Sequence, residues 1–217
     1  MAGDINPTAG GQPTGFKLAY DESATLAYDK LSAVDVAEIC RRSGATRVGE
    51  SCLSLDYIGE AYQIDISRRV ITGRSVLPEI HDQLVMLHYL TGNSPPSLQT
   101  EPITFKDLPE GLIYYPTYLK RCVQPLIERF GNNLDNFIKA GQKLKAVNIP
   151  RGDAGVHLQA LPRIGINIVL WLGDDELPAE GTVYFSSDIK NYLPIEDIAV
   201  LCQSISLKIV AAAATNH

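Results

Sequence analysis

The sequence predicts an α+β fold, built from a mixed or antiparallel sheet of short strands and hairpins with several packed helices. Segments with helical spacing of apolar residues are interleaved with short alternating segments, and the order is not the regular strand–helix–strand repeat of α/β proteins. Hydrophobic residues make up 45% and charged residues 20% of the chain, as in ordinary globular domains. We therefore expect a flexible tail at 1–15 and one α+β domain at 16–217, with the Pro-rich segment 93–97 as the point where two lobes would divide.

The first expected element is a helix over residues 21–42, broken near Leu31. Ser32, with Asp35 three residues later, resembles a capping box for the second piece. Gly44 lies where a helix commonly ends in a left-handed residue.

A β-hairpin and a further helix are expected next. Apolar residues alternate with polar ones over 53–57 and 62–66, and Gly59 provides a glycine-first turn between them. Pro78 then suits the start of a helix over 77–90, which Gly92 would end.

Two short strands are expected after the Pro-rich segment, at 103–105 and 112–115. Pro116 then suits the start of a helix that runs to residue 130, with apolar residues at helical spacing. Pro125 lies inside this helix and should kink it, because proline lacks a backbone N–H.

The last third of the chain predicts a strand-rich segment and a closing helix. Asn132 or Asn133 would cap a further helix. Pro194, followed by two acidic residues, would start the last helix. Three strands are expected between these helices, at 156–160, 166–172 and 182–185. The middle strand is almost entirely apolar, which is typical of a strand covered on both faces.

Composition excludes several classes of function. The net charge of −6 and the pI near 5.2 argue against a nucleic-acid partner, which requires a basic face. The longest apolar runs are too short to span a bilayer, and the N-terminal residues lack the apolar run of a signal peptide, so we expect a cytoplasmic protein with no membrane partner. The cysteines are scattered and are expected to be reduced.

The histidines predict no multidentate metal site. His81 and His88 lie seven residues apart on one expected helix, about 10.5 Å along its axis at 1.5 Å per residue. One imidazole is enough for an axial ligand to a tetrapyrrole, and His88, on a leucine-rich helix, is the best placed for that role.

Two polar and aromatic regions are the candidate binding surface. Tyr114–Arg121 combines three tyrosines with two cations, which offers stacking surface, hydroxyl groups and charge. The alternative is that these rings fill the core and the cations are solvated. The turns near residues 159–163 and 188–197 carry further polar groups. The candidate ligand-binding residues are Tyr115, Tyr118, Arg121, Gln159, Arg163, Asp188 and Tyr192, and we expect them to line one hollow.

Several segments resemble an uncharacterised family, the domain of unknown function 3786, of anaerobic bacteria and archaea. The matching segments are Leu87–Leu90, Ile103–Gly111, Tyr114–Pro116, Arg129–Gly131, Gln159–Arg163, Leu170–Asp174 and Tyr192–Asp197. The resemblance implies a soluble cytoplasmic protein. Relatives joined to an iron–sulfur domain of the kind found beside corrinoid proteins imply a redox or tetrapyrrole-linked role. This chain lacks the clustered cysteines of such a domain, so an iron–sulfur partner would be a separate protein.

Three hypotheses follow from these observations. The first is a ligand-binding protein, in which Arg121 and Arg163 hold anionic groups of a corrinoid or haem and the tyrosines flank its body. The second is a small enzyme with an acid–base set of Asp188, Tyr192 and Glu196. The third is an assembly subunit that docks a redox partner through its tyrosine-rich face.

Overall fold

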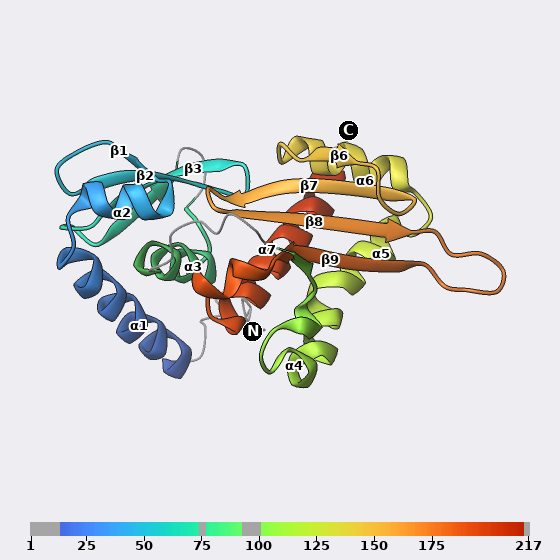
Figure 1. The fold of residues 1–217 in the computed structure, drawn as a ribbon, viewed down its shortest axis with the longest axis horizontal. Helices are drawn as coiled ribbons and strands as arrows, with labels where there is room; N and C mark the ends of the chain where they lie inside the picture. The colour runs from blue at the N-terminus through green and yellow to red at the C-terminus, as the bar shows by residue number, and fades with distance from the viewer. Residues whose placement is uncertain (1–13, 74–76, 93–100, 215–217) are drawn as a thin grey trace, which may run out of the picture.

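The computed structural model describes residues 14–73, 77–92 and 101–214 and confirms the α+β class. The α-helices are α1 (Thr14–Ser32), α2 (Val36–Ser43), α3 (Ile80–Thr91), α4 (Gly111–Tyr118), α5 (Gln124–Phe130), α6 (Leu134–Lys143) and α7 (Ile195–Ala214). Shorter helical turns are η1 (Phe105–Asp107), the π-helical η2 (Leu119–Val123) and η3 (Ser187–Asn191). The helices surround two antiparallel sheets that lie side by side (Figure 1).

The small sheet has the order β1-β2-β3-β4. Its strands are β1 (Thr46–Arg47), β2 (Cys52–Tyr57), β3 (Glu60–Asp65) and β4 (Val70–Gly73). The expected hairpin is confirmed: Leu53 pairs with Ile64 and Leu55 with Tyr62, and all four side chains are buried. The glycine-first turn is wrong, because Gly59 is the second residue of the turn, after Ile58. The period-2 alternation of β2 therefore places its apolar residues on the covered face.

The larger sheet has the order β5-β9-β8-β7-β6, and every neighbouring pair is antiparallel. Its strands are β5 (Pro102–Ile103), β6 (Val147–Ile149), β7 (Ala154–Leu161), β8 (Ile164–Trp171) and β9 (Glu180–Ser186). The three long strands coincide with the expected strands. Val169 and its neighbours on β8 are buried on both faces of the sheet, as the apolar run predicts.

Helix α7 is the central helix of the fold. It packs against α3, α4, α5, α6 and η2, and in Figure 1 it crosses the middle of the molecule. Within the described chain it is the one helix with the length and apolar composition of a membrane span, with a mean hydropathy of 1.6. A core helix of a soluble protein passes the same test, and the packing of α7 against five other elements accounts for its apolar composition.

The two sheets meet at the turn between β2 and β3. Ile58 and Gly59 occupy this two-residue turn with positive φ angles of 47° and 80°. Ile58 is 1% exposed, and its N–H donates to the Ala160 carbonyl on β7 at 2.8 Å. The hairpin turn is therefore anchored to the larger sheet by a buried backbone hydrogen bond.

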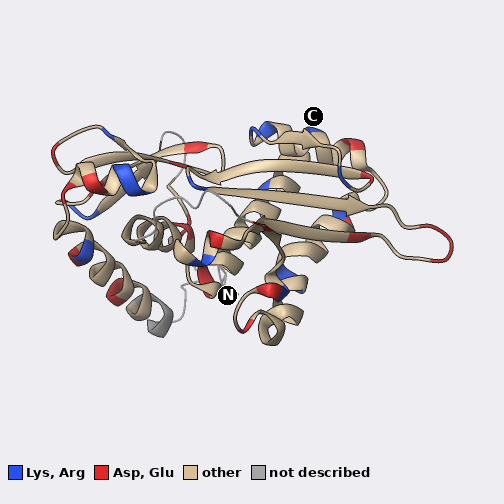
Figure 2. Ribbon diagram, in the orientation of Figure 1, with Lys and Arg blue, Asp and Glu red and all other residues tan. Residues whose placement is uncertain are grey.

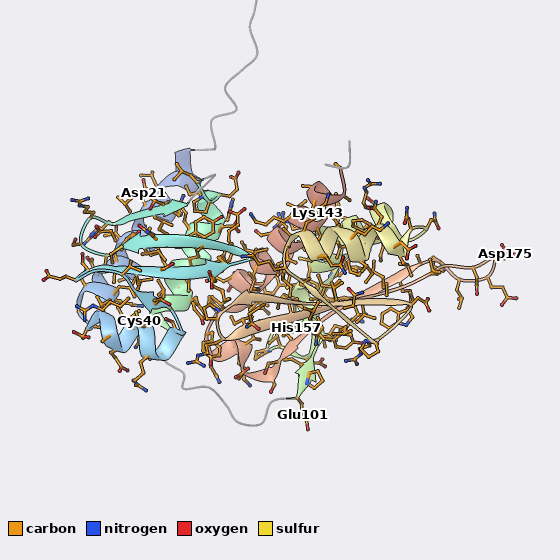
Figure 3. All side chains as sticks on the ribbon, turned by 90° about the horizontal axis from the view of Figure 1, so that it is seen from above. Asp21, Cys40, Glu101, Lys143, His157 and Asp175 are labelled. Atoms are coloured by element: carbon orange, nitrogen blue, oxygen red, sulfur yellow. The ribbon has the colours of Figure 1, made fainter. Side chains whose placement is uncertain are left out.

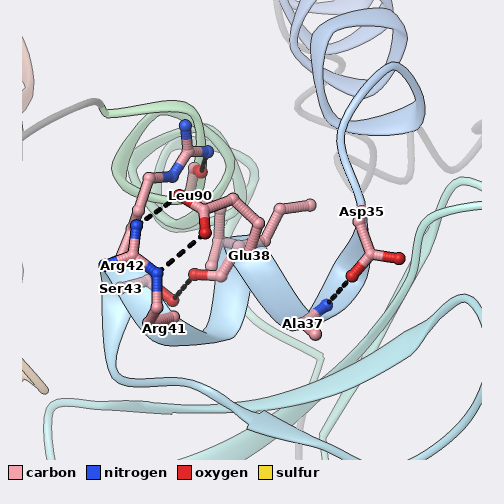
Figure 4. A network of polar contacts seen from close by, with 8 residues as sticks. Asp35, Ala37, Glu38, Arg41, Arg42, Ser43 and Leu90 are labelled. Atoms are coloured by element: carbon pink, nitrogen blue, oxygen red, sulfur yellow. Dashed lines mark hydrogen bonds and ion pairs between the residues drawn. The ribbon is translucent and has the colours of Figure 1, made fainter.

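Capping explains the break between α1 and α2, with one correction to the expected motif. Asp35 is itself the N-cap of α2 and accepts a hydrogen bond from the Ala37 N–H at 2.7 Å (Figure 4). The capping box expected from Ser32 is therefore wrong. The expected helix end is confirmed, because Gly44 adopts φ 77° and its N–H donates to the Cys40 carbonyl. Arg42 reaches across to the Leu90 carbonyl at 3.2 Å and ties α2 to the end of α3 (Figure 4).

The strand expected at 112–115 is wrong. Gly111 starts a helical path that continues through α4, η2 and α5 to Phe130. A Cβ atom on Gly111 would lie 1.9 Å from the Phe105 carbonyl oxygen, so glycine lets the helix start close against η1. Pro116 lies within α4 and does not start a helix, whereas Pro125 follows the π-helical η2, where the kink was expected.

The remaining boundaries are close to those expected. Asn133 caps α6 and accepts from the Asn136 N–H, and α7 follows Pro194. Helix α1 begins at Thr14, inside the segment expected as a tail. The segment 93–97, expected as the division between lobes, lies outside the described residues. Lys, Arg, Asp and Glu are interspersed over the drawn ribbon (Figure 2).

Candidate functional site

The larger sheet has a covered face and an open face. Val156 and Leu158 of β7 and Ile166 and Ile168 of β8 are at most 1% exposed and point toward the helices. Alternate residues point the other way. On that face Val169 is buried, whereas His157, Gln159, Gly165 and Asn167, nearer the turn between β7 and β8, are half-buried or exposed. In Figure 3, His157 lies across the sheet from Lys143 at the end of α6. The open face therefore presents the polar side chains of these strands.

A hollow of about 420 Å³ lies at one end of this face, and we call it the sheet-face hollow. Its walls come from β5, β7, β8, β9, the turn between β7 and β8, and η3 with Tyr192 after it. The lining residues are Pro102, His157, Gln159, Pro162, Arg163, Gly165, Asn167, Phe185, Ser186, Asp188 and Tyr192. Four of the seven predicted ligand-binding residues lie here: Gln159, Arg163, Asp188 and Tyr192.

His157 is held in a defined orientation on the floor of this hollow. Its Nδ1 lies 2.7 Å from Oδ1 of Asn167, with which it is paired across β7 and β8. Because a carbonyl oxygen can only accept, the neutral ring carries its proton on Nδ1 and keeps a free lone pair on Nε2. Gly165 makes room for the ring, since a Cβ atom there would lie 2.6 Å from His157 Cε1.

Arg163 and Asp188 place opposite charges near Tyr192. Burial, then Asp188, raises the pKa of the Tyr192 hydroxyl, and Arg163 opposes this effect. Neither Arg163 nor Asp188 forms an ion pair with another described residue. Both charges therefore remain available to a ligand in the hollow.

The arginine is positioned through its backbone. The Arg163 N–H donates to the Tyr89 hydroxyl at 3.0 Å, and this hydroxyl in turn donates to the Ser43 carbonyl. The Tyr89 and Tyr192 rings pack with centroids 5.9 Å apart. The turn that carries Arg163 is thus fixed to α2 and α3 on its inner side.

Two neutral groups complete the lining. The Gln159 side chain uses its amide N–H to donate to the Leu161 carbonyl at 2.8 Å, which leaves its own oxygen free. The Ser186 hydroxyl is buried and has no hydrogen-bond partner among the described residues. An unpaired buried hydroxyl is costly, so it is a group that a ligand would satisfy.

The tyrosine-rich junction lies on the helical side of the sheet, away from this hollow. Tyr118 and Arg121 line a separate hollow of about 200 Å³ between α4, η2 and α7, which we call the helix hollow. Tyr118 is 4% exposed and stacks on Phe105 at 4.0 Å. Burial, followed by the neighbouring Cys202 and Cys122 thiols, raises its pKa well above the usual range.

The other predicted residues are separated from the sheet-face hollow. Tyr115 stacks beside Tyr118 at 6.1 Å with Lys106 over its ring at 4.2 Å, and it lines neither hollow. Glu196 lines the helix hollow, whereas Asp188 and Tyr192 line the sheet-face hollow. The expectation that all seven residues share one hollow is wrong, and the expected acid–base set is also divided.

His88 is engaged in a hydrogen bond inside the fold. Its Nδ1 lies 2.5 Å from Oδ2 of the buried Asp197 in the first turn of α7. His88 lines neither the sheet-face hollow nor the helix hollow. Among the described residues, no group of three or more His, Cys, Asp or Glu side chains is arranged to hold a metal ion.

Sequence reasoning missed His157, Asn167 and Ser186. His157 and Gln159 lie two residues apart on one strand, and this spacing places both on the same face. The pairing of β7 with β8, which brings Asn167 opposite His157, depends on the bulge near Gln159 and Leu161. The sequence alone does not predict that register.

Fold and hollow together define a two-sheet α+β protein with a polar recess on an open sheet face. The profile of the family described as Domain of unknown function (DUF3786) matches residues 35–208. The chain therefore belongs to this family. No curated protein and no solved structure matches it.

Proposed function

We propose that this chain is a cytoplasmic protein that binds a small polar ligand in the sheet-face hollow. The ligand class is a carboxylic acid with a hydroxyl or amino donor close to its acid group. The observation that carries the proposal is that Arg163 and Asp188, neither in an ion pair with a described residue, both act electrostatically on Tyr192 and line one hollow with it. A volume of about 420 Å³ falls within the usual size of small-molecule sites.

Each polar group has a matching role in this proposal. The Arg163 guanidinium would pair with the ligand carboxylate, as planar guanidinium groups do. Asp188 and Nε2 of His157 would accept hydrogen bonds from the donor of the ligand. The buried Ser186 hydroxyl would gain the partner that it lacks within the described chain.

A tetrapyrrole, which the family resemblance implies, fits these residues less well. A haem or corrinoid needs a slot that covers a large apolar ring. The sheet-face hollow instead mixes Pro102, Pro162 and Phe185 with charged and polar side chains. The helix hollow has about half its volume. His88, the expected axial ligand, lies outside both hollows. Haem and cobalamin therefore serve as comparison ligands in the test below.

Catalysis at the same hollow is the second candidate function, and the His157–Asn167 pair favours it. A histidine with one nitrogen fixed by a hydrogen bond and the other free is the usual form of a general base. His157 would take the place that Glu196 had in the expected acid–base set, beside Asp188 and Tyr192.

Docking of a redox partner is the third candidate, supported by an exposed apolar surface on α4. Leu112 and Ile113 are 71% and 77% exposed, and Tyr114 is 46% exposed. Large exposed apolar groups side by side are typical of interaction surfaces.

Ligand screening tests the proposal directly. We would titrate the ¹⁵N-labelled protein with L-lactate, L-alanine, succinate, haem and cobalamin, and follow backbone amide shifts and the visible spectrum. We expect L-lactate or L-alanine to shift the amides around Arg163 and Ser186, and Arg163→Gln to weaken that binding at least tenfold. Arg129→Gln on α5 is the matched control and should leave it unchanged. Binding of haem or cobalamin alone, or no shift with any acid, would reject the small-acid proposal.

A further inference from the structure

A second hollow, separate from the sheet-face hollow, surrounds a buried carboxylate. Asp82 lies in the first turn of α3 and is 3% exposed. Its Oδ1 accepts hydrogen bonds from the Tyr57 hydroxyl at 2.7 Å and from the Ser204 hydroxyl at 2.5 Å. These bonds join β2, α3 and α7 at one atom.

The second oxygen of this carboxylate has no such partner. Among the described residues no donor reaches Oδ2 of Asp82, and no cation forms an ion pair with it. The N-terminal dipole of α3 favours the charge only in part. Oδ2 is not among the fully buried atoms that lack a partner, and Asp82 lines a hollow. This oxygen is therefore open to the hollow, where it can accept from a donor outside the described chain.

Asp82 faces a space large enough to admit one. It lines a hollow of about 620 Å³ between α3, α7 and η2, which we call the Asp82 hollow. Val200 and Leu207 contribute apolar wall, and Leu207 is 50% exposed. The volume lies in the range of small-molecule sites.

Two cations line the same hollow. Arg121 comes from η2 and Lys208 from α7, and neither forms an ion pair with the described residues. Glu79 and His81 line it as well. The hollow therefore combines the carboxylates of Asp82 and Glu79, an apolar wall and two cations that form no ion pair among the described residues. A ligand that satisfies all three has a positive end, a short apolar body and a negative end.

We propose that the Asp82 hollow binds a linear ω-amino acid. The ammonium group donates to Oδ2 of Asp82 and neutralises the buried charge. The methylene chain lies against Val200 and Leu207, and the carboxylate pairs with Arg121 and Lys208. This site shares no lining residue with the sheet-face hollow, so it stands or falls independently of the function proposed above.

Three probes distinguish the contribution of the ammonium end of the ligand from that of its carboxylate end. We would measure binding of 6-aminohexanoate, hexylamine and hexanol to the wild-type protein by calorimetry and by amide shifts. The expected order is 6-aminohexanoate first, hexylamine at least tenfold weaker, and hexanol weaker again. Binding of hexanol equal to that of hexylamine, or no saturable binding of either amine at millimolar concentration, would overturn the proposal without any variant.

Variants then assign the contacts. Asp82→Asn keeps the size of the side chain and an oxygen that accepts from Tyr57 and Ser204. It should weaken 6-aminohexanoate at least tenfold. Lys208→Gln should weaken 6-aminohexanoate several-fold but leave hexylamine unchanged. Lys190→Gln on η3 is the control, and binding that responds equally to Lys190→Gln and Lys208→Gln would also overturn the assignment.

Discussion

Gly59→Ala should loosen the attachment of the small sheet to the larger one. Gly59 has φ 80°, and a Cβ atom there would lie 2.8 Å from the Leu144 carbonyl oxygen. A left-handed alanine costs roughly 1–2 kcal/mol. Relief of the clash would displace the turn and weaken the Ile58–Ala160 hydrogen bond, for about 1 kcal/mol more. We expect a loss of roughly 2–3 kcal/mol in the free energy of unfolding.

Urea denaturation measures this loss, and thermal unfolding should show a fall of roughly 4–12 °C, at 2–4 °C per kcal/mol for a chain of this size. Gly49→Ala is the matched control, because a Cβ atom there would lie 3.3 Å from Cys52 Cβ and 3.8 Å from the Cys52 backbone nitrogen, and the residue has no positive φ. Gly59→Asn separates the two costs: asparagine tolerates a left-handed φ but carries the same Cβ atom. Gly59→Ala as stable as Gly49→Ala would refute the reasoning, and full stability of Gly59→Asn would refute the contact with Leu144.

Three further predictions concern side chains inside the fold and the hollow. His88→Ala leaves the buried Asp197 without its partner at 2.5 Å, and chemical denaturation should show a loss of roughly 2–3 kcal/mol; a loss below about 0.5 kcal/mol would contradict this. Burial raises the pKa of the Cys202 thiol from 9.0 to about 12. As the pH rises, the thiol therefore loses its proton in the unfolded chain before it does so in the folded chain, and the free energy of unfolding falls between pH 9 and 12. This group contributes a slope of roughly 1.4 kcal/mol per pH unit to the dependence of that free energy on pH. Denaturation curves of Cys202→Ala at several pH values should lack this contribution. Gly165→Ala should displace the His157 ring, and long-range ¹H–¹⁵N spectra should show Nε2 as the unprotonated nitrogen in the wild type but a mixture of tautomers in the variant.

Sequence patterns predicted the elements whose apolar residues follow one clear period. The alternation of Leu53, Leu55 and Tyr57 is visible because one face of β2 is buried. The cap at Asn133 and the left-handed Gly44 are also local, since each depends on one residue and its nearest neighbours. Such features do not require knowledge of which segments meet in space.

The strand predicted at 112–115 is wrong because its apolar residues match the composition of a strand but do not form part of the core. Leu112 and Ile113 are exposed on α4, so their apolar character says nothing about the core. What fixes the helix is the stack of Tyr118 on Phe105 and the close approach at Gly111. Both are tertiary contacts, and tertiary contacts override local propensity.

The sequence predicted only part of the candidate site, because which residues meet in one hollow also depends on tertiary contacts. Gln159, Arg163, Asp188 and Tyr192 lie near two polar turns that the sheet brings together. Tyr118 is the last residue of α4 and Arg121 lies in η2, on the other side of the same sheet. Sequence distance cannot reveal on which face of a sheet a turn opens, because one residue of register reverses every side chain.

The position of Arg121 shows how a local irregularity reaches a proposed site. Pro125 has no N–H to donate to the carbonyl of residue 121, four positions earlier, and the backbone before it widens into the π-helical η2. Cys122 and Val123 remain buried at 1% and 2% exposure, while Arg121 lines both the helix hollow and the Asp82 hollow. From the sequence, Pro125 predicts a kink but not the π-helical segment before it. If the irregularity positions Arg121, then Pro125→Ala should weaken binding of 6-aminohexanoate. Binding of hexylamine, which uses Asp82 and the apolar wall but not Arg121, should stay unchanged.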